Sequence, residues 1–175
     1  MPNHIFQLDR LLSATFPRFV DDIVREEWQG KERDCVNRFA MGYLVDACYT
    51  KRVPFLKHPT QISIEMPIGK PDTVGIKKSL SKDLVIWRKP WASCWDKDWS
   101  PSLAPLAVIE WKVSRGSKGG KKAEHEKAWL RDFATSNHRS VGYAVSLRFD
   151  GLNPGCQITV ARFFRSEHEP KWFVR

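Results

Sequence analysis

The stretch Leu106-Ala-Val-Ile-Glu-Trp-Lys-Val113 decides how this chain folds, because it is almost wholly apolar yet carries two charges two positions apart. Successive side chains of a strand point to opposite faces, so Glu110 and Lys112 share one face and Trp111 lies on the other. A run this apolar predicts a buried strand, in which unpaired charge is costly. The two charges therefore indicate a functional site or, alternatively, a salt-bridged pair on an edge strand.

A second apolar strand, predicted from Asp83 to Trp87, also opens with an acid. Taken alone, Asp83 is typical of a turn residue that starts a strand. Taken with Glu110 and Lys112, it adds a second carboxylate to one edge of the sheet. Two carboxylates and a lysine are what metal-assisted hydrolysis of a phosphodiester requires.

Composition narrows the class of protein and its partners. The chain has 175 residues, 42% of them hydrophobic, and a net charge of +9, which predicts one domain with an acidic partner. Nucleic acid is the commonest such partner, and a membrane surface or an acidic protein is the alternative. Its four cysteines form no CxxC pair, which favours a reducing, cytoplasmic setting, and its five histidines show no metal-ligand spacing. No apolar run approaches the roughly 20 residues that cross a bilayer, and no signal peptide is visible, so we expect no membrane segment.

Hydrophobic spacing predicts the order of the elements. Helical periodicity extends from about 17 to 28, and a clean 3.6-residue stripe follows from Val36 to Ala47. Alternation predicts a strand over 61–66, and a further helix is expected over about 123–136. Beyond these elements and the strands opened by Asp83 and Leu106, we expect strands over 141–149 and 157–164 and a possible short one over 172–174. This order predicts a mixed sheet flanked by helices.

Residues 88–105, rich in Trp, Pro and Ser, are predicted to form an inserted loop. Within and before it, tryptophans recur every four residues, at Trp87, Trp91, Trp95 and Trp99. Such a cluster is typical of a local core beneath a long loop. The alternative is an aromatic face that stacks on unpaired bases or binds a partner.

Together these residues resemble the PD-(D/E)xK nuclease superfamily, with its restriction-endonuclease-like fold. The resemblance covers about residues 30–150 of a single domain spanning 1–175. It implies an α/β (α+β) protein with an αβββαβ core and a central sheet of four to five strands. It rests on Asp83 at the start of the second strand, on Glu110 and Lys112 in the third, and on the order of elements.

The resemblance also assigns roles. Asp83 and Glu110 would ligate Mg²⁺ or Mn²⁺, hard cations that prefer carboxylate and water oxygens. Lys112 would position or deprotonate the attacking water, or stabilise developing negative charge. A further acid comes from the first helix of such proteins, and Glu32 is the preferred candidate, with Glu26 and Glu27 as alternatives. Glu32 could equally be a first-turn acid that favours the helix dipole.

Further candidates surround this set. Glu65 on the first strand and Lys127 on the helix after the third strand could reach the site, although the lysine could instead extend to solvent. A basic stretch that could contact phosphates follows the third strand, and it contains Arg115, Lys118, Lys121 and Lys122.

The chain departs from the family pattern in two places. Lys82 stands where the motif has proline, and the literal Pro71-Asp72 lies in a predicted turn. A second Glu-x-Lys, Glu169-Pro170-Lys171, has proline at its centre and no apolar run before it, which predicts a surface segment.

The leading hypothesis is a metal-dependent nuclease, with DNA favoured over RNA and internal cleavage favoured. The alternative from another class is a catalytically silent nucleic-acid-binding or assembly subunit that keeps the fold. A third is a basic protein-interaction subunit. Since the chain is short for a family member with its own sequence-reading domain, we expect a homodimer or a partner that supplies targeting.

Overall fold

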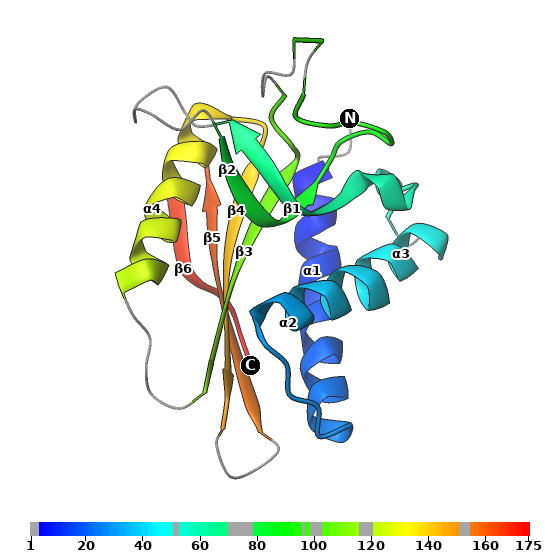
Figure 1. The fold of residues 1–175 in the computed structure, drawn as a ribbon, viewed down its shortest axis with the longest axis vertical. Coiled ribbons are helices and arrows are strands. Elements are labelled where there is room, and N and C mark those ends of the chain that lie inside the picture. The colour runs from blue at the N-terminus through cyan, green and yellow to red at the C-terminus, as the bar shows by residue number, and fades with distance from the viewer. Residues whose placement is uncertain are drawn as a thin grey trace.

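A mixed six-stranded sheet forms the centre of the protein, with helices on both faces (Figure 1). The computed structural model describes residues 4–50, 53–69, 79–95, 97–98, 103–115, 121–150 and 155–175. The helices are α1 (His4–Arg25), α2 (Glu32–Phe39), the π-helical turn η1 (Ala40–Leu44), α3 (Val45–Tyr49), the short 3₁₀ turn η2 (Pro59–Gln61) and α4 (Lys121–Ser136). The strands are β1 (Ile62–Gly69), β2 (Ser79–Ile86), β3 (Ala107–Arg115), β4 (Val141–Phe149), β5 (Cys156–Phe164) and β6 (Glu167–Val174).

The strands lie in the sheet in the order in which they occur in the chain. All neighbouring pairs are antiparallel except β3 and β4, which are parallel. Parallel neighbours need a crossover, and α4 provides it between these two strands. The predicted α+β class, mixed sheet and helical crossover are therefore confirmed.

The predicted count of four to five strands is wrong, because β6 is a full strand rather than a short one. It runs through the Glu169-Pro170-Lys171 segment and pairs only with β5. Proline lacks a backbone N–H, which an edge strand tolerates because that side of the strand has no partner. The segment is exposed, as expected, and it forms part of an edge strand.

Helix α1 begins well before the predicted start at residue 17. Residues on both sides of Pro17 are buried in the core, among them Leu12, Phe16 and Phe19. The proline removes one backbone hydrogen bond, and the burial on either side outweighs that loss. A proline in the middle of a helix therefore has the appearance of a helix start in the sequence.

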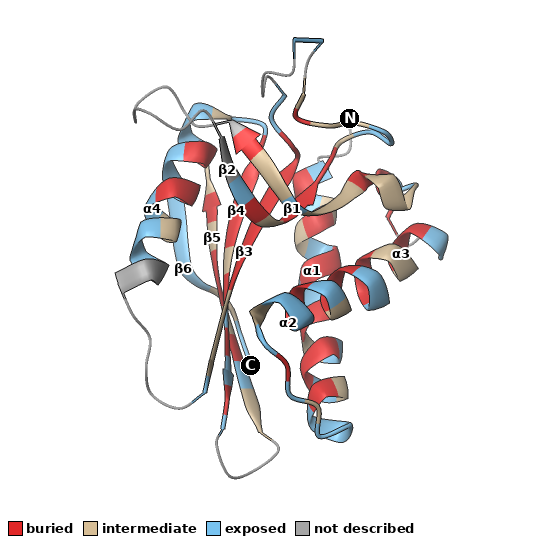
Figure 2. Cartoon of the chain, viewed as in Figure 1, coloured by how far each residue is buried: buried red, intermediate tan, exposed pale blue. Residues whose placement is uncertain are grey.

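Two apolar layers pack against the sheet, one on each face, and the buried residues concentrate along the sheet and the inward sides of the helices (Figure 2). On one face, Trp111 packs against α1 and α2, with ring centroids 5.7 Å from Phe19 and 5.2 Å from Phe39. On the other face, Trp129, Leu130 and Phe133 of α4 are buried. Among the described helices, none is long and apolar enough to cross a membrane.

The tryptophan-rich segment contributes to the second apolar layer. Trp87 is buried and donates its indole N–H to the Ser63 hydroxyl at 3.0 Å, and Trp95 is partly buried against the same layer. Trp91, in contrast, is 79% exposed. No helix forms in the described parts of 88–105, so the tryptophans do not make one helical face. Trp99 and Pro71-Asp72 lie outside the described residues.

Candidate active site

The predicted acidic residues meet where β2 and β3 separate. The two strands pair at only three positions, and the last pair toward the C-terminal end of β3 is Leu84 with Ile109. Asp83 and Glu110 are the next residues on each strand. Beyond this point β2 no longer supplies backbone acceptors to β3, so the β3 N–H groups on that side need other partners.

Two side-chain carboxylates accept hydrogen bonds from these β3 N–H groups in place of β2. Asp83 Oδ2 accepts a hydrogen bond from the Trp111 backbone N–H at 2.7 Å. Glu32 Oε2 accepts one from the Val113 backbone N–H at 3.4 Å. Glu32 is the first residue of α2, so it is both a first-turn acid and a residue that reaches the sheet. The first-turn interpretation of Glu32 is therefore confirmed, and its predicted part in a metal site stays a prediction.

Glu110 and Lys112 share one face of β3, as alternation predicts. Both line a cavity of about 80 Å³ together with Glu126 and Lys127 of α4 and residues of β4. Trp111 lies in the apolar layer on the other face. The alternative of an exposed salt-bridged pair is wrong, because Glu110 is only 6% exposed. The two side chains also pair with other residues: Glu110 with Lys82, and Lys112 with Glu32 and Glu126.

Asp83 and Glu110 lie on neighbouring strands, each directly after the last pair that joins β2 to β3. Burial raises the pKa of Glu110 to about 7, and the charge of Lys82 opposes this rise. Asp83 raises it further through its charge and through side-chain hydrogen bonding. Two neighbouring carboxyl groups repel each other when both are ionised, so this position favours a proton or a cation.

Lys82, which the sequence reading did not select, supplies a cation at this position. Its ammonium forms an ion pair with the Glu110 carboxylate, and both side chains are buried. The same ammonium lies 3.6 Å from the centroid of the Trp129 ring of α4. The only signal in the sequence was a lysine in an apolar strand where the family motif has proline.

Lys112 is held by carboxylates from two different helices. Its Nζ lies 3.1 Å from Glu32 Oε1 and 3.1 Å from Glu126 Oε1, and it donates to the Trp111 carbonyl at 2.7 Å. Burial lowers the pKa of Lys112, but hydrogen bonds and charges from Glu126 and Glu32 outweigh that effect and raise it above its ordinary value. Lys112 is therefore a fixed positive charge at neutral pH.

The remaining candidates lie farther from this cluster. Lys127 lines the same cavity, but its ammonium pairs with Glu124 at 2.8 Å, and Glu126 is the α4 residue that contacts Lys112. Glu65, at a left-handed φ of 53°, pairs with Arg33 at 3.3 Å near the surface. Arg115 is exposed at the end of β3. Glu26 pairs with Arg38.

The structure describes no side chain of the three lysines that follow β3. Lys118 lies outside the described residues. Lys121 and Lys122 are in the first turn of α4, and the structure does not describe their side chains.

The acidic pair suits a hard divalent cation in its chemistry. Asp83 and Glu110 provide adjacent oxygen donors, and the Lys82 ammonium shows that the position beside Glu110 accommodates a cation. The described residues contain no group of three or more Asp, Glu, His or Cys side chains arranged around one ion position. Mg²⁺ is often held by one or two carboxylates plus water and substrate phosphate, so two suffice.

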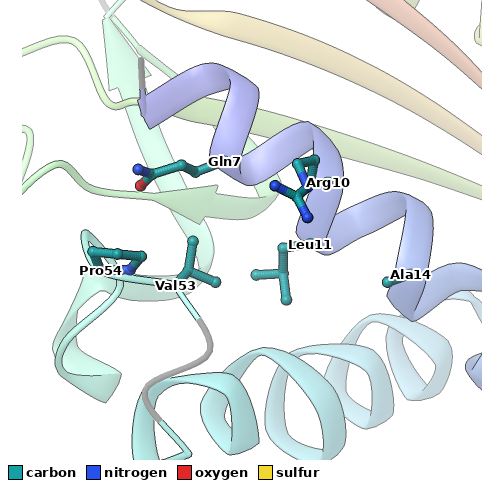
Figure 3. Close-up of a pocket in the computed structure, with 6 residues that line it drawn as sticks. All are labelled: Gln7, Arg10, Leu11, Ala14, Val53 and Pro54. Carbon is teal, nitrogen blue, oxygen red and sulfur yellow. The ribbon is translucent and has the colours of Figure 1, made fainter. Parts of the chain in front are cut away.

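A larger cavity of about 430 Å³ lies elsewhere, between α1 and the segment at Val53 and Pro54 (Figure 3). Gln7 and Arg10 are its polar lining residues, and Leu11 and Ala14 contribute apolar surface. None of the predicted catalytic residues lines it. It is therefore separate from the acidic cluster.

No protein-family model, curated protein or solved structure matches this chain. Fold and geometry define its class: an α+β protein in which two neighbouring interior strands of a mixed sheet carry the site, with Asp83 on β2 and Glu110 and Lys112 on β3.

Proposed function

We propose that this protein is a metal-dependent phosphodiesterase that cleaves nucleic acid, and that DNA is its substrate. The proposal rests on one observation above the others: Asp83 and Glu110 lie on neighbouring strands at the point where β2 and β3 separate, and Lys112 lines the same cavity as Glu110. The net charge of +9 favours a polyanionic substrate. The order of elements through β4 also agrees with the αβββαβ core of PD-(D/E)xK nucleases.

Each residue has a defined part in this proposal. Asp83 and Glu110 would hold Mg²⁺ or Mn²⁺, which would lower the pKa of a bound water and neutralise negative charge on phosphate. Lys112 is protonated in this arrangement, so it stabilises negative charge on the phosphate rather than removing a proton from water. Glu32 and Glu126 fix the Lys112 ammonium from two sides.

A cleavage assay tests the proposal. Supercoiled plasmid, linear duplex and single-stranded DNA are incubated with the protein in Mg²⁺, Mn²⁺ or EDTA. Wild-type protein cleaves DNA only with metal, and Asp83→Asn and Lys112→Met lower the rate at least a hundredfold. Lys171→Met is the matched control, since it removes an exposed lysine from the second Glu-x-Lys sequence and leaves cleavage unchanged. Equal cleavage by all four proteins would attribute the activity to another site or to a contaminant.

The second candidate is a catalytically silent nucleic-acid-binding or assembly subunit. The observation in its favour is that Lys82 already neutralises Glu110 within the protein. This candidate requires DNA binding that is independent of metal and is not followed by cleavage on any substrate. In that case Arg115→Ala weakens binding across sequences and reduces the salt dependence by about one counterion. A homodimer or a targeting partner remains part of both proposals.

A further inference from the structure

We infer that Lys82 is a built-in counter-ion of the Asp83–Glu110 pair, and that a divalent cation bound by this pair displaces the Lys82 ammonium. The inference rests on the proposed function, because it takes Asp83 and Glu110 as the metal-binding carboxylates. It adds a regulatory device to that site, in which the protein exchanges an internal cation for an external one.

The surroundings of the Lys82 ammonium are those of a cation site. The Lys82 side chain is 4% exposed and the Glu110 side chain 7% exposed, so water screens neither charge effectively. The Trp129 ring covers the ammonium at 3.6 Å from its centroid, a position in which the negative face of the ring attracts a positive charge. The ammonium is thus enclosed by a carboxylate of β3 and an aromatic face of α4.

Charge balance makes the two occupants exclude each other. Asp83 and Glu110 together carry two negative charges when ionised, and Lys82 offsets one of them. A divalent ion by itself neutralises the charge of both carboxylates. If Lys82 stayed in contact with Glu110, two cations would share one carboxylate in a buried site, where like charges repel strongly.

The local structure allows the exchange. Lys82 lies on β2 beyond the last pair that joins β2 to β3, so its movement breaks no hydrogen bond between these strands. Its side chain has a flexible four-carbon stem, whereas the guanidinium of arginine is rigid and planar.

Metal binding without nucleic acid provides the first test. Isothermal titration of Mn²⁺ at pH 8 compares the full-length wild-type protein with Lys82→Met, which keeps most of the side-chain volume and removes the charge. Lys82→Met binds Mn²⁺ at least tenfold more tightly than wild type, and adding Glu110→Gln removes the gain. Lys171→Met, which removes an exposed lysine, binds as wild type does. Equal Mn²⁺ affinity of wild type and Lys82→Met overturns the inference, as does a gain that persists with Glu110→Gln.

A second measurement uses the unaltered protein, so it does not depend on the folding of a variant. In protein labelled with ¹³C at the lysine ε-carbon, the Trp129 ring current shifts the Lys82 ε-methylene resonance upfield. Adding Mg²⁺ moves this resonance to the position of an ordinary exposed lysine. A resonance that stays upfield at saturating Mg²⁺ overturns the inference.

These results are separable from those of the cleavage assay. Metal-dependent cleavage by wild type with equal Mn²⁺ affinity in Lys82→Met overturns the exchange and leaves the nuclease intact. Tighter binding by Lys82→Met without cleavage by either protein supports the exchange and overturns the nuclease.

Discussion

The Asp83 carboxylate accepts a hydrogen bond from the Trp111 backbone N–H, 28 positions later in the chain, at 2.7 Å. This bond replaces the ladder bond that β2 would have made had it continued beside β3. Asp83 therefore has two separable properties: an acceptor that completes the sheet and a negative charge that faces Glu110.

Two substitutions of Asp83 separate these properties. Asp83→Ala leaves the Trp111 N–H without its acceptor, and we expect a loss of about 1 to 3 kcal/mol in the free energy of unfolding. Asp83→Asn retains an acceptor oxygen and costs less, although both variants lose the charge. Urea denaturation in EDTA measures the difference. Equal losses in the two variants would contradict the hydrogen-bonding role.

The raised pKa of Glu110 predicts how stability depends on pH. Between pH 4.5 and about 7 the folded protein keeps the Glu110 proton while the unfolded chain loses it. The contribution of Glu110 is therefore fully present below pH 4.5 and is lost as pH rises to about 7, by up to about 3 kcal/mol. Denaturation in EDTA from pH 4 to 8 measures this fall. Glu110→Gln cannot titrate, so the pH-dependent difference between the two proteins isolates the effect, and parallel curves would exclude it.

The buried pair of Lys82 and Glu110 predicts strong coupling between substitutions. At pH 8, where Glu110 is ionised, Lys82→Met or Glu110→Leu alone leaves one buried charge without its partner, at a cost of about 3 to 5 kcal/mol. The double variant removes both charges and recovers most of that stability. A double-mutant cycle by chemical denaturation measures the coupling, and additive losses would show that the two side chains act independently.

Helix α1 is connected to the sheet by a second, partly buried ion pair. Asp9 binds the Arg162 guanidinium at 3.0 Å through each of its oxygens and accepts the Tyr143 hydroxyl at 2.6 Å. Asp9→Ala leaves Arg162 poorly paired, and we expect a loss of about 2 to 4 kcal/mol in a urea melt. Asp21→Ala removes an ion pair to Arg175 whose side chains are about half exposed, and it should cost no more than about 0.5 kcal/mol. Similar losses in both variants would contradict this ranking.

The charge state of Lys112 can be measured through its chemical reactivity. Glu32 and Glu126 raise the pKa of the Lys112 amine, so few molecules carry a neutral, nucleophilic amine at pH 8 to 9. The double variant Glu32→Gln/Glu126→Gln lowers that pKa and accelerates acylation of Lys112, as followed by mass spectrometry of peptides. Lys171 in the same digest is the internal reference. Unchanged Lys112 reactivity would exclude control by these two carboxylates.

Much of the framework is encoded locally. The run from Leu106 to Val113 specifies an interior strand. Its alternation places Glu110 and Trp111 on opposite faces of the sheet, because successive side chains of a strand alternate between faces in any fold. Hydrophobic periodicity likewise predicted β4, β5 and the helix that connects β3 to β4. It failed at Pro17, where a proline inside α1 resembled a helix start, and at β6, whose proline is tolerated only because the strand lies at the edge.

The tertiary structure decided which side chains pair with one another in the acidic cluster. The sequence by itself determined that Asp83, Glu110 and Lys112 would lie on neighbouring strands. This follows from the two-residue alternation of side chains within each strand and from the order of the strands in the chain. The pairing of Lys82 with Glu110, and of Lys112 with Glu126, was decided only by where β2 leaves β3 and where α4 packs. Contacts of this kind join residues far apart in the chain through long side chains, and local periodicity carries no information about where such side chains meet.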